Sequence, residues 1–186
     1  NIDPIICFYI QGKSYPMTSR DELLDQIPMM RKKYVKYATY ADATMETIFT
    51  KEQLAKAGVL TCTTTESIVL INNSQLSFTK KHLPIEAQFS KSQSILADDY
   101  DADGHTDLIL LGNFFSYRTQ LGESDASYGL FLKGNGKGDF TPMTPEATGL
   151  FADGDVRAAV VIKDRQGQRK IVVAKNNDVP QTISIH

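Results

Sequence analysis

The chain has 186 residues, of which 41% are hydrophobic and 9% aromatic, so it is long enough to bury a core of its own. Its 20 basic and 22 acidic side chains leave a formal net charge of −2, which gives no long-range field to recruit nucleic acid or an anionic membrane surface. No apolar run approaches the roughly 20 residues needed to cross a bilayer. We therefore expect neither a nucleic-acid partner nor membrane insertion.

The first 17 residues resemble the end of a β unit. Residues 5–8 form an apolar, strand-like run that contains Cys7. The second cysteine is Cys62, and the sequence leaves open whether the two form a disulfide, because a reduced cysteine is also common inside proteins as a small hydrophobe.

Residues 18–58 carry the signals of short helices. Ser19-Arg-Asp-Glu22 is a capping box, in which the serine and glutamate side chains bond the first backbone amides of a helix. A second helix is predicted over Pro28–Tyr37, because proline suits a first helical turn. Thr50-Lys-Glu-Gln53 is a further capping box, for a helix that Gly58 would end. We expect a helical insertion between two β units.

The segment Arg31–Tyr40 mixes basic residues with tyrosines. Such a mixture occurs in helices that bind nucleic acid or a membrane surface. It is also typical of a solvated basic face beside a tyrosine and methionine stripe on the core. The slight acidity of the whole chain favours this second interpretation.

The rest of the chain contains an internal repeat with a period of about 62 residues. Val69–Thr79 aligns with Phe131–Thr141, and both patterns are typical of a strand, a tight turn and a second strand. About 30 residues later, each copy continues with a polar turn and an apolar strand that ends in asparagine, Asp99–Asn113 in one and Ile162–Asn176 in the other. Each unit thus offers about four strands, the content of one propeller blade or one small meander.

The repeat divides the chain into four predicted segments. Asn1–Cys7 resembles His105–Leu111, which indicates that the chain is a fragment of a longer repeat protein and begins inside a truncated unit. The segments are 1–17 as the end of a truncated blade, 18–58 as a helical insertion, 59–120 as a blade with an acidic loop, and 121–186 as a degenerate blade.

The acidic loop has the spacing D-x-D-x-D-G-x-x-D. In a tightly curling loop, carboxylates at positions one, three, five and nine and the carbonyl at position seven converge on one hard cation, while Gly104 makes the sharp turn. Ligands that are all oxygen select calcium or magnesium, and a small carboxylate-rich loop favours calcium. The predicted calcium ligands are Asp99, Asp101, Asp103, His105 through its carbonyl, and Asp107.

The surroundings of the loop distinguish it from an EF-hand, because an apolar strand, Leu108–Leu111, follows it instead of a helix. The alternative is a solvated acidic turn without metal, although four carboxylates in nine residues repel one another unless a cation is present. In the last repeat the ligand set has been lost, and Lys170 stands where Asp107 stands. Its charge could lie near the place that a cation would fill.

Taken together, the loop with its strand Asp99–Asn113 and the turn Gly134–Phe140 resemble FG-GAP or VCBS-type repeats, the calcium-loop blades of integrin-like β-propellers. With Ser127–Leu130 and Gly154–Arg157, they resemble the C-terminal part of bacterial secreted proteins related to the ASPIC/UnbV group. The resemblance implies a β-propeller, placement outside the cytoplasm and a binding or scaffolding role. The expected fold is mainly β with a helical insertion, a partial β-propeller of about two and a half four-stranded blades.

A long loop, Asn113–Ser127, is the candidate recognition surface, because binding residues tend to lie on long loops of β scaffolds. The alternative is a connection packed on itself by pairing of opposite charges. The candidate ligand-binding residues are Tyr117, Arg118, Glu123 and Asp125.

None of the three histidines, His82, His105 and His186, lies in a nucleophile elbow or an H-E-x-x-H pattern. We therefore expect a non-enzymatic, calcium-stabilised module for binding or assembly outside the cytoplasm. Its partner would be a protein or glycan, further blades of the same longer chain, or another copy. Distant acid pairs can also meet in space, so the alternative is part of a secreted or cell-surface hydrolase acting on glycans.

Overall fold

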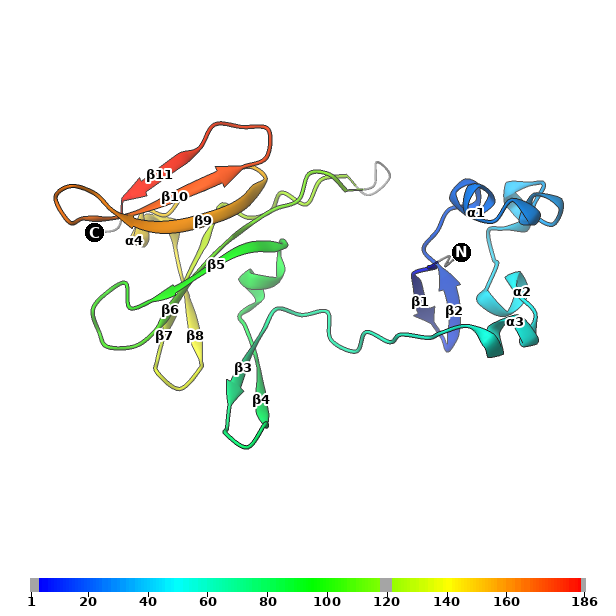
Figure 1. Cartoon of the computed structure of the whole chain (residues 1–186), viewed down its shortest axis with the longest axis horizontal. Coiled ribbons are helices and arrows are strands. Elements are labelled where there is room, and N and C mark those ends of the chain that lie inside the picture. The colour runs from blue at the N-terminus through cyan, green and yellow to red at the C-terminus, as the bar shows by residue number, and fades with distance from the viewer. Residues whose placement is uncertain (1–3, 118–121, 185–186) are drawn as a thin grey trace. The chain divides into compact units, whose positions relative to one another are not determined.

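A computed structural model of the chain describes residues 4–117 and 122–184. The chain divides into two compact units, residues 1–62 and residues 63–186 (Figure 1). The fold is mainly β, with several small antiparallel sheets and short helices. None of the helices in the two described ranges has the length and apolar character needed to cross a lipid bilayer.

The first unit combines one β-hairpin with short helices. Its elements are β1 (Cys7–Ile10), β2 (Lys13–Pro16), α1 (Arg20–Gln26), the 3₁₀ turns η1 (Pro28–Lys32) and η2 (Tyr37–Thr39), α2 (Met45–Ile48) and α3 (Lys51–Lys56). The capping boxes predicted at Ser19 and Thr50 are both present, because each cap amide donates to the side chain of Glu22 or Gln53. These two boxes begin α1 and α3.

The predicted helix over Pro28–Tyr37 is wrong, since the structure has the two separate 3₁₀ turns η1 and η2 there. Arg20 lies against the break between them. Its Nε donates to the Tyr34 carbonyl at 2.7 Å, and its Nη2 donates to the Val35 carbonyl at 2.9 Å. The guanidinium holds these two carbonyls outside a helical hydrogen-bond ladder.

The helices enclose a small core, and the start of the chain belongs to it. Ile48 is buried in this core, and Ile5 of the N-terminal segment packs against the same cluster. The predicted segments 1–17 and 18–58 therefore lie in one compact unit. Cys7 and Cys62 are not joined by a disulfide.

The described residues of the second unit form three antiparallel sheets. β3 (Ile68–Asn72) and β4 (Phe78–His82) form a hairpin that projects from the unit (Figure 1) and is followed by the 3₁₀ turn η3 (Ile85–Gln88). The four-stranded sheet consists of β5 (Ser92–Asp98), β6 (Asp107–Gly112), β7 (Leu130–Gly134) and β8 (Phe140–Met143). After the short helix α4 (Pro145–Thr148), the three-stranded sheet consists of β9 (Val156–Lys163), β10 (Arg169–Lys175) and β11 (Gln181–Ser184).

The two predicted hairpins are both present in the structure. In β3–β4, Val69 lies opposite Lys81, and in β7–β8 the aligned Phe131 lies opposite the aligned Met143. The two hairpins thus share one register. Equal register follows from equal turn length, because the turn sets which residues face each other across a hairpin.

The predicted blade over residues 59–120 would combine β3–β6, whereas the observed four-stranded sheet combines β5–β8. The boundary expected between residues 120 and 121 lies outside the described residues, but β6 before it and β7 after it pair in one sheet, with Ile109 opposite Phe131. The loop Asp99–Asp107 therefore joins the first two strands of a sheet. Within the described ranges the sheets form neither a closed barrel nor a closed propeller.

Both faces of the four-stranded sheet are covered. On one face, Ile109 and Leu111 pack against Val156 and Ile171 of the three-stranded sheet. On the other face, the alternate residues of β6 pack with η3 and with Leu83, which lies between β4 and η3, as the two-residue period of a strand requires. The buried members of this second cluster are Ala87, Leu110 and Leu132.

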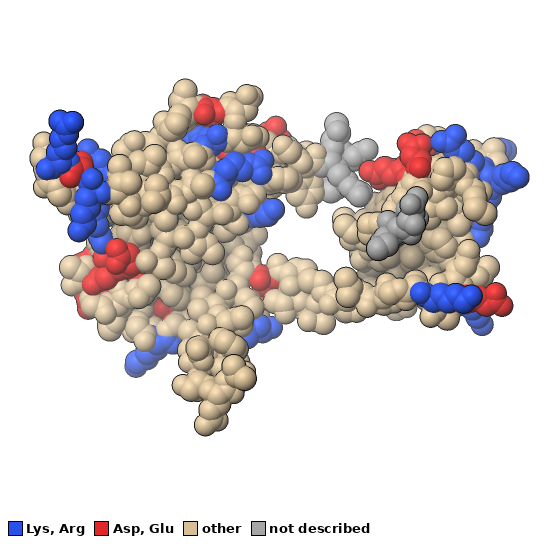
Figure 2. Space-filling model, in the orientation of Figure 1, with Lys and Arg blue, Asp and Glu red and all other residues tan. Residues whose placement is uncertain are grey.

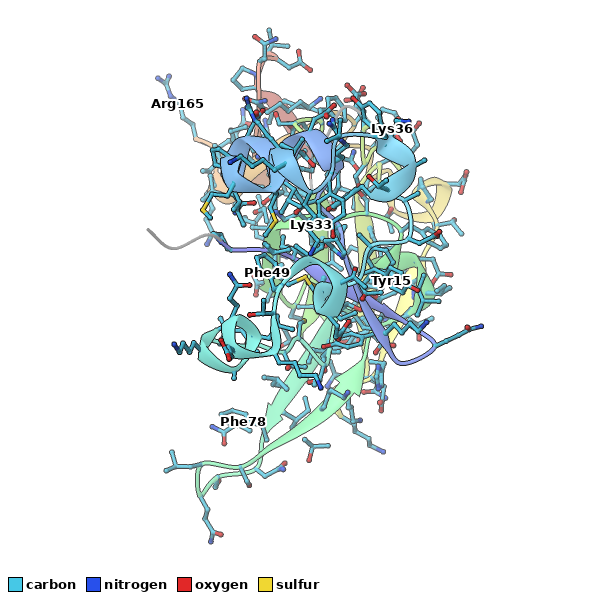
Figure 3. All side chains as sticks on the ribbon, turned by 90° about the vertical axis from the view of Figure 1, so that its right-hand side faces the viewer. Tyr15, Lys33, Lys36, Phe49, Phe78 and Arg165 are labelled. Carbon is cyan, nitrogen blue, oxygen red and sulfur yellow. The ribbon has the colours of Figure 1, made fainter. Side chains whose placement is uncertain are left out.

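Charges of both signs are interspersed over the face shown in Figure 2, without one field of a single sign. Several cations of the first unit are paired or bonded locally, as with Arg31 and Asp25 at 3.2 Å. Lys33 Nζ likewise donates to the carbonyl of Ile48 at 3.0 Å, and its place among the helices is visible in Figure 3. These local bonds fit the interpretation of Arg31–Tyr40 as a solvated face.

The repeat provides a matched test of the core. Leu132→Ala is expected to lower the free energy of unfolding by about 2–5 kcal/mol, because Leu132 is 0% exposed. The repeat-equivalent Leu70 is 56% exposed, so Leu70→Ala should cost less than about 1 kcal/mol. Urea denaturation followed by circular dichroism compares the two variants, and equal losses would contradict the placement of these side chains.

Candidate metal centre in the loop between β5 and β6

The acidic loop lies between two neighbouring strands. β5 ends at Asp98 and β6 begins at Asp107. Between them the backbone passes through two residues of positive φ, Ala102 at 62° and Gly104 at 87°. Glycine adopts such a φ without the steric cost of a Cβ, so position 104 can make the sharp turn expected of it.

The acidic side chains hold the curl of the loop by accepting hydrogen bonds from its own backbone. Asp99 Oδ2 accepts from the Gly104 amide at 2.9 Å, and Asp99 Oδ1 accepts from the Asp103 amide at 3.2 Å. Asp103 Oδ1 accepts from the His105 amide at 2.9 Å. Local bonds of this kind favour turns over helix or strand, which explains why this segment interrupts the sheet.

Three of the predicted metal ligands converge. Asp99, Asp101 and Asp107 each offer a carboxylate oxygen, and these atoms all lie within 4.8 Å of one another. Asp103 is not part of this group; one of its oxygens accepts from the His105 amide and the other meets Lys133. The geometry thus brings together three of the four predicted carboxylates.

Asp107 is the buried member of the group and is 0% exposed. Its Oδ2 accepts from the Tyr100 amide at 3.1 Å, and its Oδ1 accepts from the Gly134 amide at 2.8 Å. The carboxylate therefore joins the first strand residue of β6 to the start of the loop and to the end of β7. Position 134 needs a glycine, because a Cβ there would lie 2.0 Å from the Thr106 carbonyl oxygen.

Lys133, next to that glycine on β7, brings a positive charge into the loop. Its Nζ forms ion pairs with Asp101 and, at 3.0 Å, with Asp103. These hydrogen bonds raise the pKa of Lys133, and the bond from Lys133 lowers the pKa of Asp103 from its ordinary value of 3.8. A lowered pKa in the folded state means that this pair stabilises the loop above about pH 4 and is lost as pH falls through the folded-state pKa.

Arg169 reaches the same loop from the neighbouring sheet. Its Nη1 donates to Asp98 Oδ2 at 2.8 Å, and its Nη2 donates to the carbonyl of Asp99 at 3.0 Å. The guanidinium also lies over the ring of Tyr100, 5.1 Å from its centroid. One arginine of β10 thus ties the base of the acidic loop to the three-stranded sheet.

The corresponding loop between β9 and β10 keeps the turn but has lost the ligands. Asp164 Oδ1 accepts from the backbone amides of Gln166 and Gln168, both at 2.9 Å. Lys170 Nζ lies 3.2 Å from Asp164 Oδ2. A lysine ammonium therefore lies beside the carboxylate that remains in this loop.

The candidate ligand-binding loop is closed at its base. Phe114 and Ser124 exchange two backbone hydrogen bonds of 2.8 and 3.0 Å. Tyr117 is 50% exposed, with its ring edge-to-face on Phe114 at a centroid distance of 5.7 Å. Glu123 and Asp125 are exposed, and Arg118 lies outside the described residues.

We compared the chain with known proteins by sequence and by structure. No protein-family model matches it. No curated protein sequence and no solved structure gave a match.

Two charged residues that contact the acidic loop, Lys133 and Arg169, were not predicted from the sequence. Lys133 aligns with Ile71 of the other hairpin, and this exchange of an apolar residue for a charge is the signal that could have identified it. Arg169 gives no such signal, because its contact with Asp98 depends on how two sheets pack.

The bridge made by Asp107 gives a prediction that does not depend on metal. In the presence of a chelator, Asp107→Asn should lower the free energy of unfolding by about 1–3 kcal/mol, because the amide nitrogen would face a backbone donor inside the protein. The matched variant Asp103→Asn changes an exposed carboxylate and should cost less. Equal unfolding midpoints for Asp107→Asn and the unchanged protein in a urea titration would contradict the bridge.

Proposed function

We propose that the second unit is a non-enzymatic, calcium-stabilised β-repeat module that serves binding or assembly outside the cytoplasm. The observation that carries the proposal is the convergence of Asp99, Asp101 and Asp107 at the turn between two strands. The donors are all carboxylate oxygens, the ligand type that calcium prefers. The ammonium of Lys133 already lies against this cluster, which supports the idea that the loop suits a cation.

Five residues would hold the ion. Asp99, Asp101 and Asp107 are already grouped, and Asp103 and the His105 carbonyl are the neighbouring oxygens that would complete a calcium sphere of six or more. Bound calcium would neutralise the repulsion among the carboxylates and cross-link β6 to the loop. A dissociation constant on the order of 10⁻³ to 10⁻⁴ M would suffice in the millimolar calcium found outside cells. Such a site would be empty in the cytosol.

We also propose that the three sheets are parts of successive blades of FG-GAP or VCBS type. In this interpretation β3–β4 are the last two strands of one blade, β5–β8 are a full blade, and β9–β11 are the first three strands of the next. The shared register of the two hairpins supports this proposal. So does the position of a polar loop between the first two strands in both later sheets.

Assembly and binding would use the surfaces that these blades leave uncovered. Within the described ranges β3 pairs only with β4, although its counterpart β7 also pairs with β6. The exposed Phe78 lies on this hairpin (Figure 3), as does the exposed Leu70. The hairpin could receive strands of further blades or of another copy. The loop Asn113–Ser127, with the half-exposed Tyr117, is the proposed surface for a protein or glycan ligand.

Calcium should raise the melting temperature of the protein. With a dissociation constant on the order of 10⁻³ M, about 10 mM calcium would add about 1.4 kcal/mol to the free energy of unfolding. Differential scanning calorimetry in calcium and in a chelator measures the shift. Asp101→Ala should abolish it, whereas Asp25→Ala, in the first unit, should leave it unchanged. Superimposable melting curves of the unchanged protein in both buffers would refute the calcium role.

The proposed ligand loop is tested with a glycan and protein panel. Saturable binding without turnover is expected, and Tyr117→Ala should weaken it because the exposed ring offers apolar contact area. Tyr9→Ala is the control, since Tyr9 is an exposed tyrosine of the first unit. Turnover of a glycan that persists in Tyr117→Ala and Asp101→Ala would favour the hydrolase alternative instead.

A further inference from the structure

We propose that Lys133 is a built-in competitor for the calcium ion, so that its ammonium closes the loop when calcium is scarce and calcium displaces it when calcium is abundant. This inference rests on the calcium-binding function proposed above. It adds that the calcium affinity of the site is set by Lys133, a residue of β7 that lies outside the D-x-D-x-D-G-x-x-D pattern.

The position of Lys133 places its charge on two of the expected ligands. It lies on β7, opposite Thr141 of β8, and its Nζ contacts one oxygen each of Asp101 and Asp103. A calcium ion bound by the predicted ligand set needs those two carboxylates. The ammonium and the ion therefore cannot use the same carboxylate oxygens at the same time.

The ion pairs are placed where exchange is feasible. The side chain of Lys133 is 41% exposed, and the carboxylates it contacts are also partly exposed. Ion pairs with this much access to water contribute little to stability, so a divalent ion can replace the ammonium. The flexible four-carbon stem lets the ammonium swing out to water without moving β7.

The framework of the loop does not depend on the lysine. Asp107 is fixed by the amides of Tyr100 and Gly134, and Asp99 is fixed by the amides of Asp103 and Gly104. These bonds stay in place whether the lysine or an ion neutralises the outer carboxylates. The exchange thus changes only the partners of the more exposed carboxylates, those of Asp101 and Asp103.

Comparison with other parts of the chain shows that the hairpin does not require Lys133 and that a second polar loop also contacts a lysine. The equivalent residue in the β3–β4 hairpin is Ile71, so the register is kept without a charge there. In the loop between β9 and β10, a lysine from a different strand position, Lys170, contacts the remaining carboxylate Asp164. The chain therefore supplies an ammonium to both polar loops by independent placements.

If Lys133 competes with calcium, removing its charge should strengthen calcium binding but lower the stability of the calcium-free protein. Lys133→Met should tighten calcium binding about tenfold, because the ion no longer displaces an ion pair or meets a like charge. The same variant should melt at a lower temperature than the unchanged protein in a chelator, where nothing then neutralises Asp101 and Asp103. Lys133→Arg keeps the charge and should keep the weaker affinity.

The experiment is a calcium titration by isothermal titration calorimetry, paired with melting curves in chelator, on the full chain. The control is Lys137→Met, which removes the same charge from an exposed lysine in the turn of the same hairpin. Lys133→Gln is measured alongside, so that poor folding of the methionine variant in chelator does not prevent the comparison.

The two proposals fail in different ways. Tighter calcium binding in Lys133→Met or Lys133→Gln, with Lys137→Met unchanged, supports the competition. Equal calcium affinity in the unchanged protein, Lys133→Met, Lys133→Gln and Lys137→Met overturns it and leaves the calcium site in place. Absence of calcium binding in every protein, including both neutral variants, overturns the proposed function itself.

Discussion

The arrangement of the second unit depends on one buried carboxylate. Asp107 begins β6, is fully removed from water, and accepts one backbone hydrogen bond from Tyr100 and one from Gly134. A buried charge is tolerated only when it is well bonded, and here both partners are backbone amides of segments that must meet at the end of the sheet. The same bonds aim the carboxylate at the loop, where Asp99 and Asp101 lie within reach of a shared ion.

The packing of the sheets extends this constraint to the three-stranded sheet. Arg169 of β10 bonds to Asp98 and to the carbonyl of Asp99, so the loop is held from two sheets at once. Behind it, Ile109 and Val156 lie in the core that these sheets share. Neutralising the carboxylates would therefore stabilise more than a turn, because the loop joins elements of both sheets.

The sequence predicts local features of this protein well, and longer-range ones poorly. Capping boxes, the two hairpins and the strands on either side of the acidic loop follow from short patterns of turn residues and alternating apolar residues, so they were predictable. The grouping of hairpins into sheets was not, because the pairing of β6 with β7 joins segments separated by a long loop. For the same reason, Lys133 and Arg169 emerge as contacts of the loop only when strands and sheets are placed in space.

An anomalous-difference map from crystals of the protein grown with calcium would show whether the acidic loop binds the ion. We expect one peak at the loop between β5 and β6, within bonding distance of carboxylate oxygens of Asp99, Asp101 and Asp107, and none at the loop of Asp164. A map without a peak between those three carboxylates, or with the Lys133 ammonium still bonded to Asp101 in saturating calcium, would contradict it.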